Sequence, residues 1–112
     1  MSLRKEKEEQ HPCFRRREGV PALQVTLANG EAYLFPYIHL QSAHLTHDDS
    51  GNHLQIDFST HQISLTGTGL KEILTALQVL SVEWLGEHFQ TQSSSRCKIH
   101  SVEVHSQNIK EA

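Results

Sequence analysis

The alternation of apolar and polar residues between positions 40 and 66 constrains the fold more than any other feature of the chain. It predicts three half-buried strands, over 40–47, 53–58 and 61–66. Short turn-forming segments join them. The expected cross-strand pairs are Ala43 with Ile56, Leu45 with Leu54, Ile56 with Ile63, Leu54 with Leu65, and Phe58 with His61. Because both pairings bring apolar residues to the same face, the segment is predicted to be an antiparallel meander with one buried face.

A second hairpin is predicted upstream, around Asn29-Gly30. Asn-Gly is favoured in type I′ turns, where both central residues need a positive φ. A two-residue turn there places Val25 opposite Leu34 and sends Tyr33 and Phe35 to the other face of the strand. A strand with apolar side chains on both faces is usually covered on both sides. We therefore expect the helix, the N-terminal tail or another subunit to cover the two aromatic rings.

Residues 69–81 carry an amphipathic helical pattern of about three to four turns. Its apolar members are Leu70, Ile73, Leu74, Leu77 and Leu80. Thr68 precedes them and is the expected N-cap. Further along, residues 97–105 are rich in β-forming side chains, but their apolar positions change parity between Ile99 and Val102. This change predicts a bulge, or a strand buried on both sides.

Strands followed by a helix and a final strand place the chain in the α+β class. We expect a single curved antiparallel sheet of about five to seven strands with the helix packed on it, and leave open whether the sheet forms a partial barrel. The length of 112 residues suits one domain. The expected organisation is a charged tail over 1–18, a single α+β domain over 19–106 and a C-terminal tail over 107–112.

The charge and the cysteines narrow the class of protein. A formal net charge of -3 gives the whole molecule no general attraction for nucleic acid or an anionic membrane. Cys13 and Cys97 form neither a disulfide framework nor a CxxC motif, so we expect reduced thiols and a cytoplasmic protein. The charged start is unlike a secretory signal, and no apolar run has the length of a membrane span. No cofactor motif is present, and no cofactor is expected.

Nine histidines are the unusual feature of the composition. In the predicted meander, His44 lies on the same polar face as His53 and Asp57. Two imidazoles and a carboxylate are suitable ligands for zinc or iron(II). Diagonal neighbours in a sheet, however, lie roughly 7–8 Å apart at Cα. The competing interpretation of these residues is a solvated polar sheet face.

Two more histidines lie among apolar residues. His61 shares a side with Ile63 and lies near Phe58, where backbone or water can satisfy its ring. The alternative is a general base in a pocket lined by Phe58. His39, between two apolar residues, is similarly ambiguous. Neither histidine has a nucleophile or an acid partner that the sequence identifies.

Two short motifs suggest binding of phosphate. Arg15, Arg16 and Arg17 follow Phe14, whose ring could stack on a nucleic-acid base. The acidic residues around them oppose this, and the alternative is a solvated leader or an ion-pairing role within the chain. Gly67-Thr68-Gly69 resembles half of a phosphate-binding loop but lacks the full spacing of one. A tight turn into the helix is the alternative there.

Aromatic residues form the last candidate site. The sequence offers Tyr33, Phe35, Trp84 and Phe89 beyond what one buried face can use. Such a surplus often marks a partner surface, although a second small core is the alternative. We therefore favour a non-enzymatic protein-interaction or self-associating module, most simply a homodimer. A histidine-dependent metal-binding or catalytic site is the alternative, and a nucleic-acid accessory role through the arginines is the third hypothesis.

Overall fold

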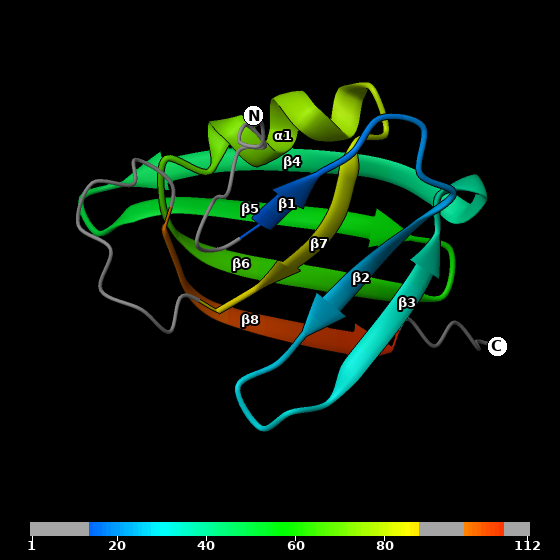
Figure 1. Cartoon of the computed structure of the whole chain (residues 1–112). Helices are drawn as coiled ribbons and strands as arrows, with labels where there is room; N and C mark the ends of the chain where they lie inside the picture. The colour runs from blue at the N-terminus through cyan, green and yellow to red at the C-terminus, as the bar shows by residue number, and fades with distance from the viewer. Residues whose placement is uncertain (1–13, 88–97, 107–112) are drawn as a thin grey trace, which may run out of the picture.

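Eight strands and one α-helix make up the described part of the chain, residues 14–87 and 98–106 of a computed structural model (Figure 1). The strands form two four-stranded sheets, so the expectation of a single sheet of five to seven strands is wrong. Neither sheet closes into a barrel within these residues. The α+β class, with mostly antiparallel strands and one helix, is confirmed.

The elements follow one another with short connections. They are β1 (Phe14–Arg16), β2 (Ala22–Thr26), β3 (Ala32–Pro36), the 3-10 helix η1 (Tyr37–His39), β4 (Leu40–Asp48), β5 (Gly51–Phe58), β6 (His61–Thr68), α1 (Lys71–Gln78), β7 (Val82–Gly86) and β8 (Lys98–Ser106). The front sheet has the order β1-β7-β2-β3, and the back sheet has the order β4-β5-β6-β8. All neighbours are antiparallel except β2 and β7, which run parallel.

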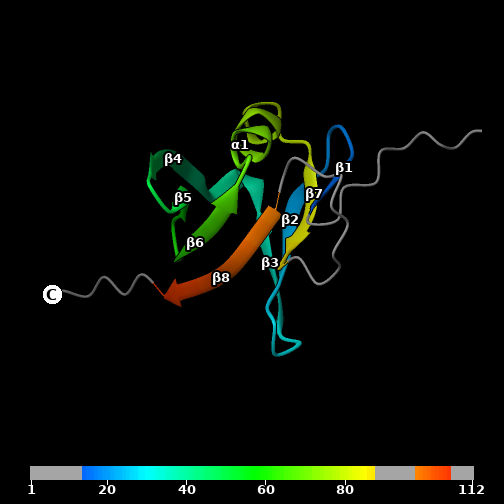
Figure 2. The same cartoon turned by 90° about the vertical axis from the view of Figure 1, so that its left-hand side faces the viewer.

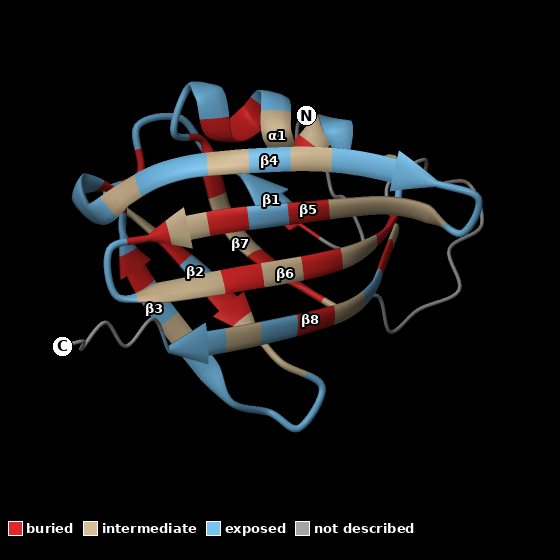
Figure 3. Cartoon of the chain, turned by 180° about the vertical axis from the view of Figure 1, so that it is seen from behind, coloured by how far each residue is buried: buried red, intermediate tan, exposed pale blue. Residues whose placement is uncertain are grey.

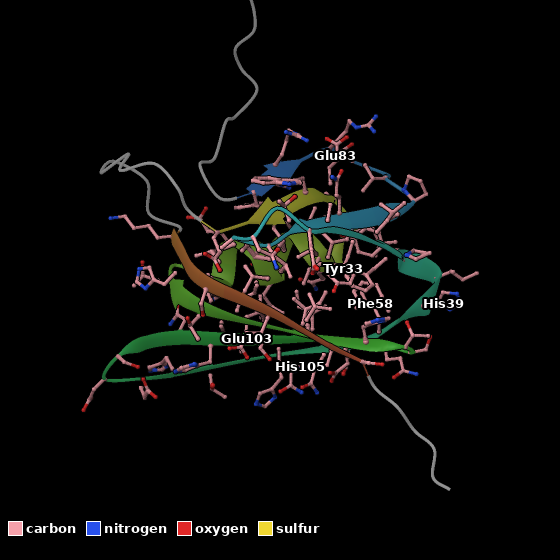
Figure 4. All side chains as sticks on the ribbon, turned by 90° about the horizontal axis from the view of Figure 1, so that it is seen from below. Tyr33, His39, Phe58, Glu83, Glu103 and His105 are labelled. Carbon is pink, nitrogen blue, oxygen red and sulfur yellow. The ribbon has the colours of Figure 1, made fainter. Side chains whose placement is uncertain are left out.

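The two sheets face each other and enclose the core, with α1 packed against β4 and β7 at one open side (Figure 2). In the view from below, Tyr33 and Phe58 lie between the sheets, whereas Glu83 lies outside the front sheet and His105 outside the back sheet (Figure 4). The fully buried side chains of largest volume are Phe14, Phe58, Leu23, Leu54, Ile56, Ile63, Leu65, Leu70, Ile73, Leu85, Ile99 and Val25. Both sheets and the helix therefore contribute to one core.

The predicted meander is confirmed as β4, β5 and β6. Ala43 pairs with Ile56 and Leu45 with Leu54. Across the next turn, Ile63 pairs with the same isoleucine. The register of β8 on β6 shifts between Thr66 and Gly67, which is the bulge predicted from the change of parity. The bulge keeps both Ile99 and Val102 buried.

The upstream hairpin differs from its prediction by one residue. Val25 pairs with Tyr33, not with Leu34. The loop has three residues: the Gly30 N–H donates to the Leu27 carbonyl, the Leu27 N–H donates to the Glu31 carbonyl, and Gly30 has φ +94°. This is a type I turn followed by a bulged glycine, which needs only one positive φ. A slip of one residue exchanges the two faces of a strand, so Tyr33 turns inward and Leu34 is 66% exposed.

The helix is shorter than the predicted span of 69–81, because it occupies Lys71–Gln78. Thr68 lies in β6 and does not cap it; instead the Asn52 side-chain carbonyl accepts the Leu70 N–H at 3.0 Å. At the other end, Ser81 donates from its N–H and its hydroxyl to the Ala76 carbonyl. Leu80 has φ +54°, a left-handed conformation that stops the helix.

Part of the predicted N-terminal tail belongs to the fold. Phe14, the first described residue, is 1% exposed, and β1 pairs with β7 through Phe14 and Leu85. The charge of this segment predicts a tail, but the ring of Phe14 lies in the core. Burying a phenylalanine side chain contributes roughly 1.5–3 kcal/mol, which helps to hold this three-residue strand on the sheet.

Tyr37 connects the two sheets, and its removal gives a pH-dependent prediction. Its hydroxyl donates to the Val82 carbonyl at 2.7 Å, and burial raises its pKa from 10.0 to about 12. The folded state therefore favours the protonated phenol. The stability that this preference adds is complete below pH 10.0 and disappears as the pH rises toward about 12. For Tyr37→Phe we expect stability at neutral pH to fall by about 1–2 kcal/mol, because the carbonyl loses its donor.

The same substitution removes one titrating group. Between about pH 10 and 12, the variant should lose about 2–3 kcal/mol less stability than the unmodified chain. Urea unfolding at several alkaline pH values measures both curves. Parallel curves for the two proteins would contradict the assignment of the raised pKa to Tyr37.

Candidate functional site

The histidines and the carboxylate proposed as metal ligands do not converge. His53 Nε2 lies 3.3 Å from Asp48 Oδ2, while the Asp57 carboxylate accepts hydrogen bonds from Ser42 and Gln55. His44 is exposed and pairs across the sheet with Gln55. Among residues 14–87 and 98–106, no group of three His, Cys, Asp or Glu side chains is placed to hold a metal ion.

Asp48 instead organises the turn between β4 and β5. The hydroxyl and the N–H of Ser50 both donate to its carboxylate, at 2.7 and 2.8 Å. These hydrogen bonds, together with the nearby His53, lower the pKa of Asp48. The carboxylate therefore has a structural role at the end of β4.

His61 lies beside aromatic rings at the edge of the core. Its ring centroid is 5.4 Å from that of Phe35 and 6.1 Å from that of Tyr33. Its Nδ1 lies 2.8 Å from the Thr60 hydroxyl. His39 is exposed at the end of η1 (Figure 4). Hydroxyl and ring contacts of this kind position an imidazole without giving it a carboxylate to orient it as a base.

Two of the three arginines pair within the chain. Arg15 Nε lies 3.3 Å from Glu83 Oε1, and Arg17 Nη2 lies 3.0 Å from Glu83 Oε2. The Arg15 guanidinium also lies 5.6 Å from the centre of the Trp84 ring. Arg16 is exposed. This matches the ion-pairing alternative for the arginines, because one carboxylate on β7 accepts from both Arg15 and Arg17.

The aromatic candidates lie mostly inside the molecule. Phe35 is 4% exposed and its ring centroid is 5.0 Å from that of Phe58, while Tyr33 stacks on Phe35 at 5.7 Å. Trp84 is half-buried and its indole N–H donates to the Thr26 hydroxyl at 2.9 Å. Phe89 lies outside the described residues. Contacts within the chain therefore account for Tyr33 and Phe35.

The Gly67-Thr68-Gly69 segment brings two backbones together. Gly67 lies in β6, and a Cβ added there would overlap the backbone carbonyl of Lys98 on β8. Gly69 has φ +66° and leads into the helix. Close approach of two strands and a left-handed turn both favour glycine. The glycines thus serve strand packing and helix entry.

A groove that the sequence pattern does not predict lies between α1 and β4. Its volume is about 430 Å³, and it is lined by Leu40, Gln41, Ser42, Ala43, Leu74, Leu77 and Gln78. Four of these seven side chains are apolar. Leu74 and Leu40 are each only partly buried. The groove therefore presents apolar surface beside the backbone of β4.

β4 is an edge strand, since β5 is its one sheet neighbour among the described residues (Figure 3). The other edges carry features that discourage pairing: β1 has three residues with two arginines, β3 ends in Pro36, and β8 carries Lys98 and Glu103. β4 has nine residues with no lysine, arginine or proline. Its bulge lies at its first residues, between Leu40 and Ser42. By residue composition β4 is the least protected edge described, and its neighbour on the other side is α1.

Comparisons with known proteins add no assignment. No protein-family model matches the chain, and no curated protein or solved structure matches it. Within the described residues, no helix is long and apolar enough to cross a membrane. The candidate site therefore depends on the geometry of β4 and α1.

Proposed function

We propose that this protein is a non-enzymatic protein-interaction module that binds an extended segment along the free edge of β4. The observation that carries the proposal is a nine-residue edge strand without lysine, arginine or proline, whose one carboxylate, Asp48, is its last residue. The apolar groove against α1 flanks this strand. An edge strand presents unpaired N–H and C=O groups to any strand that can reach them.

The expected mode of binding is strand addition. Main-chain hydrogen bonds to β4 supply affinity, and alternate side chains of the bound segment enter pockets beside the strand. The partly buried apolar side chains of Leu40 and Leu74 line that position. The preferred partner therefore alternates apolar with polar residues and extends for at least about five to six residues, the commonest length of a strand.

Capped nine-residue peptides test the proposal directly. Fluorescent peptides that alternate Ser or Thr with Val, Leu or Phe are titrated with the protein, and binding is followed by anisotropy. We expect saturable binding, together with slower hydrogen exchange at the β4 amides that point away from β5. Ala43→Lys places a charge in the groove and should weaken binding at least about tenfold, a change of about 1.4 kcal/mol.

Gln62→Lys is the matched control. It adds the same charge to β6, two strands from the edge, and should leave peptide binding unchanged. Circular dichroism of each variant checks that the fold is retained. Peptide binding that protects β8 or β3 amides, or a monomeric chain that binds no peptide in the series, would contradict the proposal.

A further inference from the structure

We infer that the segment bound by β4 is β4 of a second copy of this chain, so that two back sheets join across a two-fold axis into one continuous antiparallel sheet. This inference rests on the proposed function, because it names the occupant of the same edge. It follows from the self-pairing that the length of β4 allows, from the charges of its residues and from the composition of the other sheet edges.

The length of β4 determines the register. Two nine-residue strands that pair in antiparallel orientation along their whole length must have their two-fold axis at the central residue, His44. Ala43 then lies opposite Leu45 of the second copy, and Ser42 lies opposite its Thr46. The bulge lies outside this central stretch. Apolar side chains therefore meet on the inner face, and polar ones meet on the outer face.

A shift of the axis by one residue is less favourable. An axis at Leu45 would place His47 opposite Ala43 of the second copy, beside the apolar groove. With the axis at His44, the same imidazole lies opposite Gln41 of the second copy, and polar groups meet. The His44 register therefore matches apolar with apolar and polar with polar positions from Gln41 to His47, and leaves Leu40 opposite Asp48 at each end.

The charges of β4 permit this pairing. Its only carboxylate is Asp48, which lies opposite Leu40 of the second copy in this register, and β4 carries no lysine or arginine. No two like charges face each other at neutral pH, whereas like charges directly opposite destabilise a sheet. Every other sheet edge of the described residues contains a lysine, an arginine or a proline, and β4 contains none of these.

Pairing through β4 also produces a closed assembly. A two-fold contact uses the same surface on both copies, so the dimer has no free β4 edge left for further growth. The joined sheet then ends at β8 on both sides, where Lys98 and Glu103 lie. Since charged edges resist further strand addition, we expect a dimer and not a fibre.

Light scattering coupled to size exclusion provides the first test. The unmodified chain should elute with twice the mass of one chain at neutral pH. His44→Lys places two ammonium groups opposite each other at the axis and should give a monomer with an unchanged circular dichroism spectrum, since His44 is exposed. Gln62→Lys should remain dimeric. A dimer that persists in His44→Lys would overturn the inference.

A cysteine trap tests the register. In a chain whose Cys13 and Cys97 are replaced by serine, His44→Cys brings two thiols opposite each other, where Cα atoms of paired strands are about 4.5–5.5 Å apart. That spacing suits a disulfide. Mild oxidation should crosslink His44→Cys rapidly. Thr46→Cys, whose residue lies opposite Ser42 of the second copy, should crosslink far more slowly. Equal or reversed rates would overturn the assigned axis.

The two proposals fail in distinguishable ways. If the chain is a monomer up to millimolar concentration and still binds the alternating peptides at β4, the second-copy inference is wrong and the interaction function stands. If the chain is a monomer and no peptide protects β4, both are wrong. A capped peptide of residues 40–48 that converts the dimer to monomers would support both.

Discussion

Replacing Phe35 by alanine is expected to lower the free energy of unfolding by about 3–5 kcal/mol. The phenylalanine ring is 4% exposed and stacks on Phe58 between the two sheets. Its removal eliminates buried apolar area and leaves a cavity that the neighbouring rings only partly fill. A domain of this size has only about 5–15 kcal/mol of stability, so the variant should lose much of its cooperativity or its fold.

Leu34→Ala is the matched comparison, because it changes the adjacent residue of the same strand. Leu34 is 66% exposed, and we expect its loss to change stability by no more than about 0.5 kcal/mol. Phe35→Leu, expected to cost about 1–2 kcal/mol, keeps the experiment informative if the alanine variant does not fold. Urea unfolding followed by tryptophan fluorescence measures all three. If Leu34→Ala lowered stability more than Phe35→Ala, the hairpin would instead have a two-residue turn, with Leu34 facing the core.

Gly67→Ala is expected to lower the free energy of unfolding by a similar amount, but for a different reason. A Cβ at this position would overlap the Lys98 carbonyl and approach the Ile99 Cα to 3.1 Å. Because the obstructing atoms are backbone, rotation of a side chain cannot relieve the clash. The two strands must separate, breaking hydrogen bonds beside the bulge. We expect a loss of about 3 kcal/mol or more, at the upper end of overpacking effects.

Gly19→Asn serves as the control for the loss of a glycine. Gly19 has φ +71° with open space around it, and asparagine tolerates that conformation. We expect Gly19→Asn to lower the free energy of unfolding by less than about 1 kcal/mol. Thermal unfolding compares the two variants. If Gly67→Ala were as stable as Gly19→Asn, the close approach of β6 and β8 would have to be rejected.

The sequence predicted the back-sheet meander because its connections are short. Leu54 and Ile56 each pair with an apolar residue on β4 and with another on β6. The lengths of the loop at 48–51 and of the turn at 59–60 allow both sets of pairs. With one face buried, a slip of one residue would expose the whole apolar set. Local pattern and turn length therefore determine the same pairs that the structure contains.

The hairpin at Asn29-Gly30 shows the limit of that reasoning. A type I′ turn and a type I turn with a bulged glycine both accept the Asn-Gly pair, but their loops differ by one residue. Both faces of β3 carry apolar side chains, so the pattern alone does not select the register. The choice follows from the core, where the rings of Tyr33 and Phe35 pack against Phe58 and His61.

The candidate site is a product of tertiary structure. Nothing in residues 40–48 distinguishes an edge strand from a central one, so the sequence pointed instead to histidines, arginines and aromatic residues as candidate sites. The groove forms because α1 lies against β4 and brings Leu74 beside Ala43. The absence of lysine, arginine and proline from these nine residues was readable in the sequence, but it becomes informative only once β4 is known to be an edge.

By itself, the sequence determined the α+β class, the back-sheet meander and an amphipathic helix after β6. For β8 it left a bulge and a strand buried on both sides as alternatives. Only the tertiary structure determined the division into two sheets, the parallel pairing of β2 with β7, and the inclusion of Phe14 in the core. The physical reason is the range of the interactions. Periodicity and turn length reflect contacts between near neighbours, whereas the sheet order depends on how side chains distant in the sequence fill one shared core.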